Sequence, residues 1–395
     1  MYRNQCLICQ TTDGFYKVID FGFTAWSNNF LKQKIKSKTY PLVLVKCKNC
    51  LSVQLNYFVK KETMFLNHNY ITGVNKELKI HFKKLVNLLL LKKKNIEKVL
   101  DIGSNDGTFL KNFSKHYLRV GFEPCAKVSA KSKNIKVIKK FFSYEEAKKI
   151  KIKFDVIHAS GVFFHLEELH SVTKGIKHLL KTDGIFVIQF LYLKDIIEKV
   201  HFDQIYHEHL VYYTLNSLNI ILNLYGLEIF DVSKSNIHGG SLIAYVAHKG
   251  FKNQSTRYKT LLKQDFIFLK NFENNILIFK KRINSLKLRI NKFISLNKKK
   301  NNRIIGLGAP AKAITLLKVF NLTKNKIDFC LEINKEKVNT YLPNTDIIVK
   351  AQNNFKTRKN DCFILFSWNF KKSIIKNFIK NNKIKVIIFN PHIYG

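Results

Sequence analysis

The stretch VLDIGSNDGTFL at residues 99–110 decides the fold. Its first residues are apolar except for Asp101 and suit a buried strand, the turn GSNDG follows, and a helix is expected from Thr108. A Gly-rich turn between a strand and a helix lets backbone N–H groups approach a ligand closely. The stretch therefore predicts a ligand-binding edge of a parallel sheet.

Strands and helices alternate on both sides of this turn. Apolar runs predict strands, and apolar residues at helical spacing predict helices, the last of which Gly184 would close. Such alternation favours a doubly wound parallel sheet, which two further strands would complete. The expected strands are 118–124, 135–142, 153–160, 184–191, 226–234 and 239–249, and the expected helices are 76–94, 108–117, 125–133 and 166–184.

A second, Rossmann-like α/β unit is expected near the end of the chain. One long helix over 255–297 would precede it, because apolar residues recur there every three or four positions from Leu269 to Phe293. We interpret this stripe as packing on neighbouring domains and not as a dimerising coiled coil, although it leaves the oligomeric state open. The expected strands of this unit are 303–308, 326–332, 346–349, 361–367 and 385–390, with a helix over 309–320.

The composition fits a folded protein of two or three domains. The chain has 395 residues, of which 46% are hydrophobic, and a formal net charge of +42. That charge would attract nucleic acid, but only seven of the 69 basic residues are Arg, the residue that nucleic-acid sites favour for bidentate contacts. We interpret the charge as a chain-wide compositional bias. The sequence lacks an apolar run long enough for a membrane span and a hydrophobic signal core, so a cytoplasmic protein is expected.

Four of the seven cysteines form two Cys-x-x-Cys pairs, Cys6 with Cys9 and Cys47 with Cys50. Four thiolates are the ligands that tetrahedral structural zinc takes, and they leave no open coordination position. The sequence therefore predicts a structural zinc site near the N-terminus.

Two further stretches carry groups suited to chemistry. YHEH at residues 206–209 places two histidines beside a carboxylate, and a histidine can accept a proton near neutral pH. GLGAPAK at residues 306–312 is a second Gly-rich turn, where a helix N-terminus and Lys312 could hold phosphate groups. Taken alone, YHEH could be polar residues that cap a loop, and GLGAPAK could be helix-packing glycines with a solvated lysine.

The acidic turn and the next strand together resemble the S-adenosylmethionine-dependent methyltransferases. Glu123 ends the strand that follows the turn, where a carboxylate can accept both ribose hydroxyls of a nucleoside. The resemblance implies a class I Rossmann-like methyltransferase domain that binds S-adenosylmethionine. Its expected cofactor-binding residues are Asp101, Gly103, Ser104, Asn105, Asp106, Gly107, Glu123 and Pro124.

The whole chain resembles the nucleotide-sugar (deoxysugar) C-methyltransferases. The resemblance rests on the cysteine quartet, DIGSNDG, residues 202–214 (FDQIYHEHLVYYT), residues 238–242 (HGGSL), GAPAK and residues 367–370 (SWNF). It implies a zinc-binding domain at 1–65, a methyltransferase domain at 66–250 and a C-terminal Rossmann-like C-methyltransferase domain at 251–395. Ile243 after HGGSL, and Ala313 and Ile314 after Lys312, depart from the family pattern.

The resemblance also implies a reaction and the residues that carry it. A nucleoside-diphosphate 4-keto-deoxysugar would be methylated at a ring carbon, carbon 3 in preference to carbon 5, through an enolate. His209 would be the base, Glu208 would orient it or share its proton, and Tyr206 would bind the oxyanion. His165 is expected beside them, and Tyr70, His238, Ser241 and Lys312 are the expected substrate-binding residues.

Two alternatives stay open at the level of sequence. A nucleic-acid methyltransferase would use the same cofactor fold with the zinc site and the basic surface. A non-catalytic relative would keep only the fold. The second α/β domain and the scarcity of Arg disfavour the first, and the intact YHEH and DIGSNDG stretches disfavour the second.

Overall fold

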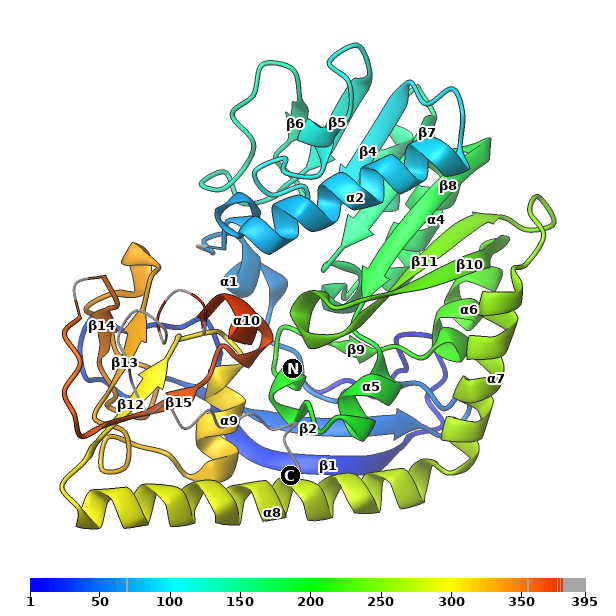
Figure 1. The fold of residues 1–395 in the computed structure, drawn as a ribbon. Coiled ribbons are helices and arrows are strands. Elements are labelled where there is room, and N and C mark those ends of the chain that lie inside the picture. The colour runs from blue at the N-terminus through cyan, green and yellow to red at the C-terminus, as the bar shows by residue number, and fades with distance from the viewer. Residues whose placement is uncertain (69, 354, 375, 377, 379–395) are drawn as a thin grey trace.

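The computed structural model describes residues 1–395 except 69, 354, 375, 377 and 379–395, and it describes no side chain for 238, 372 and 373. Its described residues form three sheets, and the seven-stranded one, from the middle of the chain, lies above the N-terminal sheet in the view of Figure 1. Five of its strands are parallel and two antiparallel strands close one side, as the sequence predicts. Its order is β10–β11–β8–β7–β4–β5–β6, with β4 at Lys98–Ile102, β5 at Leu118–Phe122, β6 at Lys136–Ile138, β7 at Phe154–Ser160, β8 at Leu180–Phe190, β10 at Leu227–Ser235 and β11 at Ser241–His248.

Few helices accompany the first strands of this sheet. The expected helix over 76–94 is present as α2 at Lys76–Lys92, and the one over 166–184 as the shorter α4 at Leu169–Leu179. The remaining helices of this part of the chain are α1 at Lys61–Phe65, α3 at Tyr144–Lys148, α5 at Leu193–Glu198 and α6 at Leu215–Asn223.

Two predicted helices are wrong. Residues 108–117 form only a 3₁₀ turn at Leu110–Asn112, because the Asn112 side chain donates to the carbonyls of Thr108 and Phe109 and so competes with the helical ladder. Residues 125–133 form turns, with the Ser129 hydroxyl bonded to the Ala126 carbonyl. The cofactor turn is therefore followed by short turns where the fold class commonly has helices.

Gly184 does not close a helix, contrary to prediction. Strand β8 begins directly after α4, and Gly184 falls in the irregular stretch between the strand pairs Phe154–Leu180 and Val156–Ile185. The extra residues are accommodated as a bulge.

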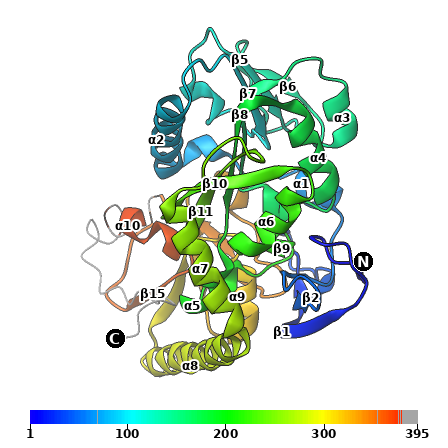
Figure 2. The same cartoon turned by 90° about the vertical axis from the view of Figure 1, so that its right-hand side faces the viewer.

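The predicted long helix is two helices, α7 at Thr256–Lys270 and α8 at Phe272–Lys299. Asn271 leaves the helical conformation, and the side chains of Asn271 and Asn275 bind the carbonyls of Ile267 and Phe268 near the end of α7. Helix α8 then runs beneath the N-terminal sheet and α9 (Figure 1; end-on in Figure 2). Its apolar stripe lies inside the chain, as predicted, since Phe272, Ile276, Phe279, Ile283, Leu286 and Ile290 are buried.

The C-terminal sheet is parallel, in the order β14–β13–β12–β15. It confirms the second α/β unit, although the expected strand over 385–390 lies outside the described residues. Its strands are β12 at Arg303–Leu307, β13 at Phe329–Glu332, β14 at Val349–Ala351 and β15 at Asp361–Leu365, and its helices are α9 at Ala313–Phe320 and α10 at Lys371–Ile374.

The N-terminal sheet contains a strand from the middle of the chain. Its order is β1–β2–β3–β9, with β1 at Phe15–Ala25, β2 at Thr39–Cys47, β3 at Val53–Leu55 and β9 at Val211–Tyr212. Strand β9 begins two residues after His209 and pairs antiparallel with β3, and the Leu55 amide donates to the Leu210 carbonyl at 2.9 Å. The segment with the predicted base is therefore hydrogen-bonded into the sheet of the cysteine pairs.

Candidate active site

The four predicted zinc ligands come together. The Sγ atoms of Cys6, Cys9, Cys47 and Cys50 all lie within 4.8 Å of one another, with Cys6 to Cys50 at 3.6 Å and Cys9 to Cys47 at 3.8 Å. Zinc–sulfur bonds of about 2.3 Å in a tetrahedron place sulfurs about 3.8 Å apart, so the quartet fits zinc. Four thiolates close the coordination sphere, which suits a structural ion.

The predicted cofactor turn leaves β4 with left-handed backbone at Gly103 (φ 72°) and Gly107 (φ 75°). A Cβ on Gly103 would lie 2.4 Å from Val162, so only glycine fits there. Glu123 follows β5 and accepts hydrogen bonds from the amides of Asn105 (2.9 Å) and Cys125 (2.8 Å). These amides fix a buried carboxylate whose remaining lone pairs suit two ribose hydroxyls, so the residues fit S-adenosylmethionine.

The Asp101 side chain is hydrogen-bonded to β7, the neighbouring strand. Its carboxylate accepts from His158 Nδ1 at 2.7 Å, and the His158 ring stacks on Phe109 with centroids 3.7 Å apart. Burial raises the pKa of Asp101, and His158 opposes that rise. His158, which the sequence analysis missed, is thus the direct partner of a predicted cofactor residue.

A segment before α2 covers the cofactor turn. Asn105 Nδ2 donates to the Tyr70 carbonyl, the Thr72 amide donates to Asn105 Oδ1, each at 2.9 Å, and the Gly73 amide donates to Asp106 Oδ2 at 3.1 Å. A Cβ on Gly73 would lie 2.2 Å from that oxygen. Tyr70 is therefore held beside the cofactor turn, with 53% of its surface exposed.

His209 is held in one tautomer by the backbone. Its Nδ1 donates to the Gln204 carbonyl at 2.7 Å, so the neutral ring carries its basic lone pair on Nε2. The Tyr206 ring lies 4.0 Å away and the His165 ring 5.2 Å away, centroid to centroid. These three side chains, grouped in the sequence-based expectation, lie together in the structure, but the Gln204 carbonyl and not Glu208 orients His209.

Glu208 points to the N-terminal segment. Its Oε1 accepts from Asn28 Nδ2 at 2.5 Å and from Trp26 Nε1 at 3.3 Å, while its backbone carbonyl accepts from His165. Only 7% of the residue is exposed. Burial raises the pKa of Glu208, and the two donors oppose that rise.

Lys312 is buried beside Asp203 and Trp368. Its Nζ lies 3.4 Å from Asp203 Oδ2 and 3.4 Å from the centroid of the Trp368 ring, and Trp368 Nε1 donates to the same Asp203 oxygen at 2.6 Å. Burial lowers the pKa of Lys312 to about 8, although Asp203 opposes this. The cluster joins GAPAK, SWNF and the start of the 202–214 segment.

Ser241 begins β11 and accepts a hydrogen bond from Gln189 Nε2 at 2.9 Å, while Gln189 Oε1 contacts His81 and Ser160. The side chain of His238 lies outside the described residues. A cavity of about 230 Å³ opens beside Ser241, between the HGGSL and SWNF segments, and includes Gly239, Gly240 and Trp368 in its lining.

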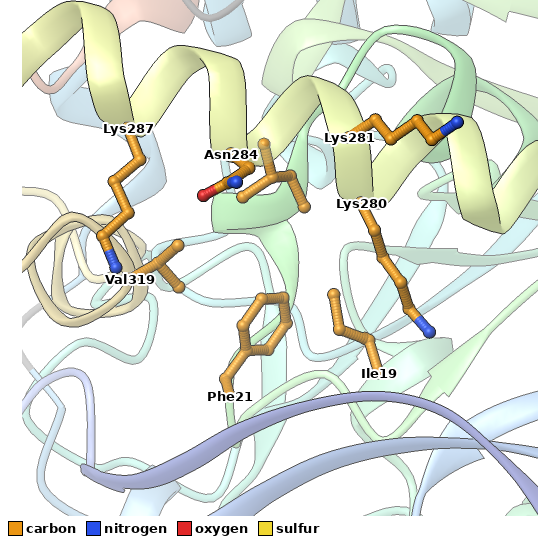
Figure 3. A pocket seen from close by; sticks show the side chains of 8 residues that line it. Ile19, Phe21, Lys280, Lys281, Asn284, Lys287 and Val319 are labelled. Carbon is orange, nitrogen blue, oxygen red and sulfur yellow. The ribbon is translucent and has the colours of Figure 1, made fainter.

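A second cavity of about 440 Å³ lies between β1 and α8 (Figure 3). Ile19 and Phe21 face it from the sheet, and Lys280 and Lys287 border it from the helix. None of the predicted site residues lines it.

In the described part of the chain, no helix is both long and apolar enough to cross a membrane.

Comparisons with known proteins match this organisation. Three family models match in succession: "Putative zinc binding domain" at residues 6–65, "Methyltransferase domain" at 74–232 and "C-methyltransferase C-terminal domain" at 236–391. The C-methyltransferase NovU of Streptomyces niveus is 25% identical over 390 residues, which cover 95% of this chain and 92% of that protein.

Solved structures resemble part of the chain. A S-adenosylmethionine-dependent methyltransferase from Clostridium acetobutylicum is 13% identical over 44% of this chain and 92% of its own, with a TM-score of 0.36. The N-methyltransferase NodS from Bradyrhizobium japonicum is 15% identical over 43% of this chain and 96% of its own, with a TM-score of 0.34.

Proposed function

The chain is an S-adenosylmethionine-dependent methyltransferase with the zinc-binding and C-terminal domains of the C-methyltransferases, and on this premise we propose that it methylates carbon. The proposed substrate is a nucleoside-diphosphate 4-keto-deoxysugar, and the proposed acceptor is carbon 3. The observation that carries the proposal is the fixed tautomer of His209 beside Tyr206.

The proposed reaction begins with proton transfer to His209. A ketone at carbon 4 acidifies the hydrogen on carbon 3, and Nε2 of His209 takes that proton, so the electron pair of the C–H bond forms an enolate. Burial raises the pKa of Tyr206 well above its ordinary value, so its hydroxyl stays neutral and can donate to the enolate oxygen. S-adenosylmethionine, when bound, supplies the electrophilic methyl group for carbon 3.

The cofactor residues we propose are the turn of Gly103, Ser104, Asn105, Asp106 and Gly107, with Glu123 and Pro124 after β5. Asp101 would act at this site with His158 as its partner. The Tyr70 carbonyl is hydrogen-bonded to Asn105, which holds the residue beside the cofactor turn, and we propose that its side chain contacts the sugar.

The substrate side would be formed by His165, Ser241, His238 and the residues around Trp368. We assign Lys312 a supporting role there and not the diphosphate contact expected from the sequence, since Asp203 and Trp368 already engage its ammonium. We also retain the domain division 1–65, 66–250 and 251–395 as a proposal.

Substitution of the base tests the function. We expect His209→Asn to lower turnover by about 10²- to 10⁴-fold, the usual contribution of a general base, with unchanged affinity for S-adenosylmethionine. His116→Asn, on an exposed loop, is the matched control. Near-normal turnover in His209→Asn would remove His209 as the base.

A further inference from the structure

Glu208 lies where three parts of the chain meet. Trp26 and Asn28 reach it from the loop after β1, and His68 interacts with it electrostatically from the segment that covers the cofactor turn. Lys337, which follows β13, interacts with it from the C-terminal part of the chain. The same His68 lies 3.9 Å from Glu123, the proposed ribose ligand.

These contacts indicate that Glu208 does not orient His209. The Gln204 carbonyl already fixes the His209 ring, and the Glu208 carboxylate accepts hydrogen bonds from the indole of Trp26 and the side-chain amide of Asn28. Glu208 is therefore a second buried acid–base group, set by donors from the zinc-binding part of the chain.

We propose that Asn28 and Trp26 are positioning residues that hold the carboxylate of Glu208 in the active site, so that the N-terminal zinc-binding segment completes the catalytic machinery. The proposal rests on the proposed function, because it takes Glu208 as a group that acts on the substrate. It assigns a catalytic contribution to a loop that carries none of the residues expected from the sequence.

The groups around Glu208 determine the pH at which its carboxylate binds a proton, and this pH can be measured. Burial raises the pKa of Glu208, whereas Asn28, Trp26, His68 and Lys337 lower it. Tyr206 also faces Glu208, and burial keeps the tyrosine neutral. Loss of the Asn28 donor removes a hydrogen bond to the ionised form, so the carboxylate should bind its proton at higher pH.

The chain offers a reporter for this titration, because it contains only two tryptophans, Trp26 and Trp368. Protein labelled with 5-fluorotryptophan should give two ¹⁹F NMR signals, assigned with Trp26→Phe. Trp26 donates to Glu208, so its signal should titrate with that carboxylate. Trp368 contacts Asp203 and serves as an internal control for the fold.

The decisive comparison is Asn28→Ala against Asn29→Ala. Asn29 is the neighbouring amide and donates to Ser37, not to Glu208. We expect Asn28→Ala to move the midpoint of the Trp26 titration upward by about one pH unit, the equivalent of one hydrogen bond to a charged group, and Asn29→Ala to leave it unchanged. Glu208→Gln should abolish the titration.

Two results would overturn the proposal. Equal midpoints in Asn28→Ala, Asn29→Ala and the unsubstituted protein would show that Asn28 does not control the protonation of Glu208. A titration of the Trp26 signal that persists in Glu208→Gln would report a group other than Glu208. The NMR reading needs no substrate, so failure of the proposed methylation is seen separately. With an active substrate, the acid limb of the kcat profile should shift upward in Asn28→Ala only.

Discussion

His207 illustrates, at the scale of one residue, how burial controls charge. It lies between two proposed catalytic residues, is fully buried, and its Nε2 donates to the Pro41 carbonyl of β2 at 3.3 Å. Burial lowers the pKa of His207 to about 4. The ring is therefore neutral in the folded protein near neutral pH.

This histidine should make the protein sensitive to acid. The unfolded state binds the proton near pH 6.5 and the folded state near pH 4, so the free energy of unfolding should fall as pH drops through this window, by about 3 kcal/mol for this group. His207→Gln should show a smaller loss in denaturation curves measured from pH 7 to pH 4. His116→Gln, with an exposed ring, should follow the unsubstituted protein, and equal pH dependence in all three would contradict the assignment.

The sequence predicts single residues well where the backbone alone determines their place. Gly103, Gly107 and Glu123 follow from a strand, a turn and a second strand, and the two Cys-x-x-Cys pairs follow from spacing. The partners of Asp101, Glu208 and Lys312 could not be predicted, because His158, Asn28 and Asp203 are brought to them only by the packing of distant segments.

At the scale of elements, the predicted strands are more accurate than the predicted helices. Strands of a buried parallel sheet are continuous apolar runs, and each strand of the seven-stranded sheet was expected, whereas the two-residue strand β9 was not. The helices over 108–117 and 125–133 fail because Asn and Ser side chains bind local backbone carbonyls, a competition that apolar periodicity does not reveal.

Helix α8 allows a direct test of its packing. Leu286 is fully buried on the apolar stripe of α8, whereas Leu288, two residues further and on the opposite side of the helix, is 67% exposed. We expect Leu286→Ala to lower the free energy of unfolding by about 2–5 kcal/mol and Leu288→Ala to change it by less than about 0.5 kcal/mol.

Chemical denaturation with light scattering would check both effects. If the stripe formed a dimer interface and not part of the core, Leu286→Ala would instead lower the molar mass in solution. It would then have little effect on the free energy of unfolding of the dilute monomer. That outcome would contradict the packing seen here.

At the scale of the whole molecule, the N-terminal sheet is the link between the zinc site and the chemistry. The Leu7 amide donates to Gln54 Oε1 at 2.8 Å, and Gln54 pairs with Val211 of β9, two residues beyond His209. The cofactor turn, by contrast, belongs to the seven-stranded sheet.

Metal removal should therefore separate binding from turnover. We expect chelation of zinc, or Cys9→Ser, to abolish methyl transfer while S-adenosylmethionine still binds, as measured by calorimetry. Zinc analysis would follow the loss of the metal, and far-ultraviolet circular dichroism the loss of the N-terminal sheet. Added zinc, but not magnesium, should restore turnover. Full turnover in protein shown to be metal-free would contradict the link.

The most direct test of the account is mass spectrometry of products formed in deuterated water. The protein would be incubated with S-adenosylmethionine and a panel of nucleoside-diphosphate 4-keto sugars. The account predicts one added methyl group on a sugar carbon, with solvent hydrogen exchange at carbon 3 that His209→Asn abolishes. Neither product nor exchange in any sugar, with cofactor binding confirmed separately, would contradict it and favour another acceptor such as nucleic acid.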